Sequence, residues 1–128
     1  MLPVPHRIRK SQDFQAVMRA GARAGTETVV VAVRAVPADH AGEPAPPWRA
    51  GFIVSKAVGN AVARHRTARR LRHLCAELLP PRQVEGHRID VVVRALPPII
   101  EADHQKLAKD LRSGLKRALR RAGHGETP

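Results

Sequence analysis

Cysteine and long apolar runs are scarce in this 128-residue chain, and each scarcity excludes a class of protein. Cys75 is the only cysteine, so the chain can form no internal disulfide and no zinc ribbon or other cysteine-rich metal site. No apolar run approaches the roughly 18 residues that a membrane span needs, and the amino terminus lacks the apolar core of a signal peptide. We therefore expect a cytoplasmic protein that has no membrane partner.

Aromatic residues are also scarce, because Phe14, Trp48 and Phe52 are the only three. A sheet that stacks several bases, as in RNA-recognition-motif or OB domains, needs more aromatic side chains than these. A nucleic-acid ligand would therefore be recognised through its backbone and shape rather than base by base.

Acidic residues are outnumbered, with 11 Asp and Glu against 23 Lys and Arg, which gives a net charge of +12 and a pI near 11.6. A charge of this size and sign is typical of nucleic-acid-binding proteins. A basic protein that is merely soluble is the alternative, but the charge is clustered rather than scattered. The length predicts one domain, which we assign to residues 1–121, followed by a disordered tail at 122–128.

Signs of catalytic or metal-binding chemistry are missing. Glu101 and Asp103 are the one close pair of acids, and their place at a predicted helix start indicates compensation of the helix dipole. The seven histidines show no compact ligand spacing, and no P-loop pattern is present. We therefore predict no catalytic residue, no metal site and no cofactor in the protein alone.

Hydrophobic periodicity and turn residues predict three helices and three strands. The helices are expected at 11–19, capped by Ser11 and ended by Gly21, from Asn60 to about Leu79, and from about Glu101 to Arg121. The strands are expected at 28–36, 50–55 and 88–95, with a proline-rich surface loop at 38–48. This order predicts an α+β fold, or α/β sandwich, in which helices pack on a sheet.

The segment from Ser55 to Arg72 reads S-K-A-V-G-N-A-V-A-R-H-R-T-A-R-R-L-R and contains six cationic side chains without one carboxylate. Arg66 and Arg70 are four residues apart, so on a helix they repel each other by roughly 0.2–0.5 kcal/mol. Arg64 and Arg66 lie in the first turns, where the helix dipole disfavours positive charge. A chain tolerates this arrangement when the phosphates of a nucleic acid supply the missing negative charge.

This segment resembles the signature of the bacterial ribonuclease P protein subunit, approximately S-K-K-x-G-x-A-V-x-R-N-x-x-K-R-x-x-R. The positions in register are Ser55, Lys56, Gly59, Ala61, Val62, Arg64, Arg69 and Arg72. The stretch S-Q-D-F-Q-A-V-M-R-A-G also resembles the family's D-F-x-x-V-F-x-x-G helix, with Asp13, Phe14, Val17 and Gly21 in register. The similarity spans roughly residues 6 to 119. His65 and Ala68 depart from the usual Asn and Lys, and Met18 and Ala32 stand where aromatics are common.

The resemblance implies a protein that assists a ribozyme, in which catalytic RNA uses bound Mg²⁺ to remove the 5′ leader from precursor tRNA. The protein would bind its RNA one to one, with higher-order assemblies open. The residues implied to contact RNA are Lys56, Asn60, Arg64, Arg66, Arg69, Arg70 and Arg72. The residues implied to line the leader cleft are Phe14, Val17 and Met18.

The resemblance also implies a fold like domain two of ribosomal protein S5, with about four strands in a mixed sheet and a left-handed β-α-β crossover. The general rule alone predicts the right-handed form, which occurs in about 98% of cases. We expect the fourth strand to flank the proline-rich loop. Two other functions stay open at this point, a ribosomal or other structured-RNA-binding protein and a self-sufficient nuclease.

Overall fold

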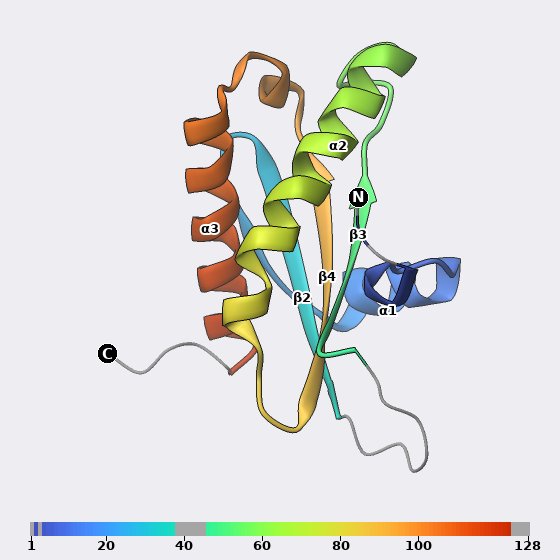
Figure 1. The fold of residues 1–128 in the computed structure, drawn as a ribbon, viewed down its shortest axis with the longest axis vertical. Coiled ribbons are helices and arrows are strands. Elements are labelled where there is room, and N and C mark those ends of the chain that lie inside the picture. The colour runs from blue at the N-terminus through green and yellow to red at the C-terminus, as the bar shows by residue number, and fades with distance from the viewer. Residues whose placement is uncertain (1, 3, 38–45, 124–128) are drawn as a thin grey trace.

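The computed structural model describes residues 2, 4–37 and 46–123, which fold into a four-stranded sheet with helices on both faces (Figure 1). The strands are β1 (Ala22–Gly25), β2 (Val29–Pro37), β3 (Trp48–Ile53) and β4 (His87–Ala95), in the spatial order β1-β2-β4-β3. The helices are α1 (Ser11–Ala20), α2 (Ala61–Leu78) and α3 (His104–Arg121), with single 3₁₀ turns at Val4–His6, Pro80–Arg82 and Pro97–Glu101. The expected α+β fold with a mixed sheet is confirmed.

The two central strands are rich in valine because both of their faces are covered. Val31 and Val33 of β2, with Val91 and Val93 of β4, are fully buried beneath α2 and α3 in the main core. The alternate residues, Ala32 and Val92 among them, point to the other face and are buried beneath α1 in a smaller cluster. Since successive side chains of a strand alternate between faces, α1 lies across the sheet from α2 and α3.

The helix boundaries agree with the sequence except at two starts. In α1 the N-cap position is Lys10, which makes no side-chain cap, so the predicted capping role of Ser11 is wrong. In α3 the predicted start at Glu101 is also wrong, because Pro97–Glu101 forms a 3₁₀ turn and Asp103 then caps the helix by accepting a hydrogen bond from the Lys106 backbone N–H at 2.8 Å.

The fourth strand is β1, and its expected place beside the proline-rich loop is wrong. It follows α1 directly and pairs antiparallel with β2, from Ala22 opposite Val33 to Gly25 opposite Val30. Four residues that include a glycine give too short a pattern for a strand to be recognised. Residues 38–45 of the predicted loop lie outside the described residues, and Trp48, its last residue, is the first residue of β3. Residues 124–128 also lie outside them, so the disordered tail stays a prediction.

The crossover from β3 through α2 to β4 is left-handed. The two strands are parallel neighbours, from Trp48 opposite Ile89 to Ile53 opposite Arg94. In Figure 1 both strands run upward, α2 passes in front of the sheet, and β4 lies to the left of β3. This is the rare hand, which the family resemblance implied and the general rule did not. Because β3 is an edge strand, the crossover leaves one flank of α2 facing that edge. Within the described residues, no helix is long and apolar enough to cross a membrane.

Candidate nucleic-acid interface

Helix α2 is fixed to the sheet by one apolar side and a cap at its start. Thr67, Leu71, Leu74 and Cys75 are buried against the sheet. Burial raises the pKa of the Cys75 thiol to about 12, which keeps this side chain protonated and inert. The Asn60 side chain accepts a hydrogen bond from the Ala63 backbone N–H at 2.9 Å, as expected for an N-cap residue.

The outward side of the same helix is cationic and lacks neutralising partners. Arg66 and Arg69 on this helix and Lys56 in the turn before it are exposed, and none of the three makes an ion pair or side-chain hydrogen bond within the described part of the chain. The one acid of α2 is Glu77, which lies in the last turns and contacts His73 at 3.3 Å. The first three turns therefore present positive charge that no acid of the described residues offsets.

Arg64 and Arg72 lie on the flank of α2 that faces the β3 edge, and both are half-buried. Their Nε atoms are buried without a hydrogen-bond partner. An unsatisfied buried donor costs about 1–3 kcal/mol, and a phosphate oxygen could satisfy it after a small side-chain movement. The two arginines border a groove of about 310 Å³ together with Ala61, His65 and Ala68.

Arg70 differs from its neighbours because the fold uses its guanidinium group. Its Nη atoms donate to the backbone carbonyls of Ile99 at 3.3 Å and Ala102 at 2.6 Å, so the side chain holds the Pro97–Glu101 turn against α2. The structure therefore gives Arg70 a structural role, and its predicted contact with RNA stays a prediction. Asn60 likewise has a structural role, as the helix cap.

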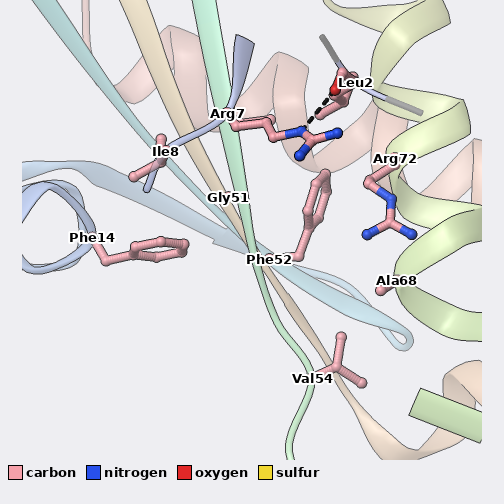
Figure 2. A pocket seen from close by; sticks show the side chains of 10 residues that line it. Leu2, Arg7, Ile8, Phe14, Gly51, Phe52, Val54, Ala68 and Arg72 are labelled. Carbon is pink, nitrogen blue, oxygen red and sulfur yellow. Dashed lines mark hydrogen bonds between the residues drawn. The ribbon is translucent and has the colours of Figure 1, made fainter. Parts of the chain in front are cut away.

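A second, larger groove of about 440 Å³ runs along the β3 edge and shares Ala68 and Arg72 with the first. Figure 2 shows Phe14 and Phe52 on opposite sides of β3, with Arg72 reaching from α2 toward Phe52. The groove thus joins Phe14, from the predicted leader cleft, to Arg72, from the predicted RNA-binding helix. It is lined by Leu2, Arg7, Ile8, Phe14, Ala50, Gly51, Phe52, Val54, Ala68 and Arg72.

Phe14 can line this groove because β3 has a glycine beneath it. A Cβ atom on Gly51 would lie 2.5 Å from Cε1 and Cζ of Phe14 and 3.2 Å from Cβ of Ile8. Any larger residue would therefore displace the ring from the strand. Gly51 is a site residue that sequence reasoning missed, since its role depends on a contact across 37 positions.

The other two predicted cleft residues lie deeper. Val17 has no exposed surface and packs with Ile8, Ala32 and Val92, so its prediction as a cleft-lining residue is wrong. Its position in the middle of α1 turns it directly toward the sheet. Met18 is half-buried at the margin of the same cluster and does not line the groove. Of the three predicted residues, Phe14 alone lines it.

The amino-terminal segment supplies groove residues that the sequence did not indicate. The Ile8 backbone N–H donates to the Ala50 carbonyl at 3.0 Å, which lays the segment along the β3 edge. The His6 ring stacks on Trp48 with a centroid distance of 3.9 Å. Arg7 is held at the groove by a 2.7 Å hydrogen bond from its Nε to the Leu2 carbonyl (Figure 2). The only sequence signal for Arg7 was its charge.

On the α1 face, by contrast, arginines are neutralised within the protein. Buried Asp90 accepts paired hydrogen bonds from Arg49, at 3.0 and 2.8 Å, and from Arg88, at 2.9 and 3.1 Å. The hydrogen bond to Asp90 raises the pKa of Arg49 despite its partial burial. Arg49 also contacts Asp13 of α1 at 3.5 Å, which ties that helix to the sheet. These two arginines are therefore structural.

The described residues contain no group of three or more His, Cys, Asp or Glu side chains that could hold a metal ion. The interface is therefore made of two adjoining grooves and the exposed basic side of α2. This arrangement can bind phosphates and stack one or two bases.

Known proteins with related sequences decide the family. The family model described as Ribonuclease P matches residues 2–119. The chain belongs to the ribonuclease P protein family. The ribonuclease P protein component of Streptomyces avermitilis is 51% identical over 124 residues, which cover 93% of this chain and 96% of that protein. The component of Kocuria rhizophila is 50% identical over 121 residues, which cover 94% and 98% of the two chains.

Solved structures of the family support the fold. The RNase P protein of Staphylococcus aureus superposes with a TM-score of 0.68 at 23% identity, covering 94% of this chain and 98% of that one. The RNase P protein of Thermotoga maritima superposes with a TM-score of 0.66 at 22% identity, covering 89% and 96%. At these identities the likeness concerns the architecture, and the four-stranded mixed sheet with its helices is common to all three.

Proposed function

We propose that this protein is the RNA-binding subunit of ribonuclease P and that it assists removal of the 5′ leader from precursor tRNA. The observation that carries the proposal is the flank of α2, where Arg64 and Arg72 keep unsatisfied donors and Arg72 also lines the groove that contains Phe14. The basic side of α2 binds the catalytic RNA, and the groove along β3 holds the single-stranded leader. Family membership through close relatives supports the same function.

The chemistry of cleavage belongs to the RNA in this proposal. We infer that the RNA holds the Mg²⁺ ions and that the protein holds the two RNAs together. We propose one protein for each catalytic RNA and a cytoplasmic location, where precursor tRNA is processed. The protein's contribution is electrostatic, since its free arginines offset the repulsion between the two polyanions.

Reconstitution with the cognate catalytic RNA tests this function. Cleavage of a precursor tRNA is measured with and without the protein over a series of Mg²⁺ concentrations. Because Mg²⁺ also screens RNA repulsion, the rate enhancement by the protein should shrink as Mg²⁺ rises. An enhancement that is equal at every concentration would contradict the electrostatic role.

Two further outcomes separate the alternatives. A protein that binds structured RNA but never stimulates cleavage would belong to the ribosomal or general RNA-binding class. Cleavage by purified protein free of RNA would identify a self-sufficient nuclease. In a binding measurement, tRNA that lacks the leader is the matched control, because it removes the groove's ligand and leaves the contacts of α2 unchanged.

A further inference from the structure

A second cationic surface lies on α3, outside the interface described above. Lys109, Arg112, Lys116 and Arg120 are all exposed, and their spacing of three, four and four residues places them within about 80° of one another around the helix. We call these four residues the α3 stripe. They extend over about 16 Å of helix, at a rise of 1.5 Å per residue.

The α3 stripe has no partners within the described part of the chain. None of its four side chains makes an ion pair or a hydrogen bond there. Arg112 with Lys116, and Lys116 with Arg120, are like charges four residues apart on the helix, so the members of each pair repel each other. The stripe is therefore slightly destabilising in the free protein.

The other cations of α3 are used by the fold. Lys106 contacts Asp110 at 3.3 Å, and Arg117 donates to the Gly25 carbonyl at 2.7 Å. Arg121 donates to the Arg23 carbonyl. The contacts of the two arginines join α3 to the open edge of β1. The helix thus separates cations that serve the fold from four that face solvent without partners.

The α3 stripe is also rigidly held. Leu107, Leu111, Leu115 and Leu119 are buried on the opposite side of the helix, against the sheet. Since burying four leucines leaves the helix little freedom to rotate, the backbone positions from which the four charged side chains extend are fixed. Such pre-organisation lowers the entropy lost on binding.

We propose that the α3 stripe binds the phosphate backbone of the catalytic RNA and extends the contact made by α2. Charge complementarity selects a polyanion, because four unpaired cations lie in line without a carboxylate among them. Continuity selects the catalytic RNA, because α2 and α3 are in contact and form one layer on one face of the sheet (Figure 1). The leader groove lies at the β3 edge of the sheet, whereas α3 packs on β1 and β2, at the other edge. This inference rests on the proposed function and enlarges its RNA-binding surface.

The test measures how binding depends on salt. The full chain binds the cognate catalytic RNA, without tRNA, at KCl concentrations from 50 to 200 mM and fixed Mg²⁺. Each phosphate contact contributes about 0.9 to the slope of log affinity against log salt concentration. The quadruple variant K109Q/R112Q/K116Q/R120Q should lose two to four of these contacts. The ratio of its affinities at 50 and 200 mM KCl should then be about 10- to 150-fold smaller than the same ratio for the unchanged protein.

A matched control removes the same net charge from the opposite side of the sheet. Arg9, Lys10, Arg19 and Arg94 are exposed cations without side-chain partners in the described residues. The variant R9Q/K10Q/R19Q/R94Q should keep a salt slope close to that of the unchanged protein. Equal slopes in the two variants would show an effect of net charge alone and overturn the proposal.

Two more results would overturn the inference without touching the proposed function. One is an unchanged salt slope in the stripe variant while the unchanged protein binds RNA strongly. The other is a stripe variant whose defect appears only when precursor tRNA is added, which would make tRNA the occupant. Failure of the unchanged protein to bind the catalytic RNA would instead overturn the proposed function. Thermal melts verify folding, and removal of the repelling pairs should leave the midpoint equal or higher.

Discussion

The contact between Gly51 and Phe14 gives the sharpest test of the leader groove. In Gly51→Ala the new Cβ would lie 2.5 Å from two carbon atoms of the Phe14 ring, whereas the optimal distance between non-bonded carbon atoms is about 3.5–4.0 Å. The ring must therefore move by about 1 Å or rotate out of the groove. Phe14 is half-buried at the groove, so the ring has room to swing toward solvent.

Two opposing contributions set the effect on stability. Overpacking costs about 1–3 kcal/mol, and replacing glycine by alanine recovers about 0.4–1 kcal/mol by restricting the unfolded chain. A net loss of about 1 kcal/mol should lower the melting temperature by a few degrees. The protein stays folded, so its binding can be measured.

The effect on the leader should be larger than the effect on the fold. Stacking of one base on an aromatic ring contributes about 1–3 kcal/mol, and a displaced ring loses part of that. Loss of about 1–1.4 kcal/mol corresponds to a five- to tenfold weaker affinity of the holoenzyme for precursor tRNA. Affinity for the catalytic RNA alone and for tRNA without a leader should stay unchanged.

Gly25→Ala is the matched control, because a Cβ at this position in β1 would meet no atom within 4 Å. A double-mutant cycle with Phe14→Ala then isolates the contact. If Gly51 acts by giving the Phe14 ring room against β3, then Gly51→Ala should lower the affinity for the leader only slightly in a protein that already carries Phe14→Ala. An equal loss with and without Phe14, or a loss of the same size for tRNA that lacks a leader, would refute this reasoning.

Three further predictions concern other parts of the molecule. Arg64→Ala and Arg69→Ala should each weaken binding of the catalytic RNA by at least about 1 kcal/mol in a filter-binding assay, because a charge-assisted hydrogen bond contributes about 1.5–3 kcal/mol. Unchanged binding in both variants would show that this side of α2 does not contact the RNA. Arg70→Ala should instead lower the melting temperature by several degrees, because two backbone carbonyls lose a charged donor, and should leave the salt dependence of RNA binding nearly unchanged. The pKa of Asp110 lies below its ordinary value of 3.8, because hydrogen bonds from Thr28 and Lys106 outweigh the opposing effect of burial. Its stabilising effect is therefore present above that value and is lost as pH falls through the lowered pKa, so melts below about pH 4 should show a fall that Asp110→Asn flattens.

The sequence predicted well those elements whose signals are local. Asn60 at the start of α2 and Gly21 at the end of α1 mark helix ends in the structure. The leucine repeat of α3 and the valine runs of β2 and β4 identified the buried sides. In each case a cap, a period or a β-branched run lies within one element, so the pattern is complete without knowledge of the partner.

The groove could not be predicted in the same way, because its residues meet through contacts distant in sequence. Arg7 reaches it through a bridge to Ala50, and Gly51 matters only because Phe14 lies on top of it. The strand at Ala22–Gly25 was missed because four residues carry almost no periodic signal. The hand of the crossover was given by family resemblance, since local physics favours the opposite hand.

The sequence predicted least well which arginines are bonded within the protein and which are left exposed, and this difference decides which of them are available to RNA. Charge alone made Arg70 resemble Arg69, yet Arg70 holds two carbonyls while Arg69 is exposed and unpaired. Acids neutralise only the arginines and lysines that hold elements together, as Asp90 does with Arg49. Part of the surplus positive charge therefore lies on the outer surfaces of α2 and α3. In the free protein that surplus opposes the compact state, and in the complex it contributes to affinity. A ligand that binds only the folded state at a hundred times its Kd stabilises that state by about 2.7 kcal/mol. Bound RNA thus supplies the negative charge that the folded protein lacks. In the free protein, the buried valines and leucines stabilise the fold against the repulsion among its cations.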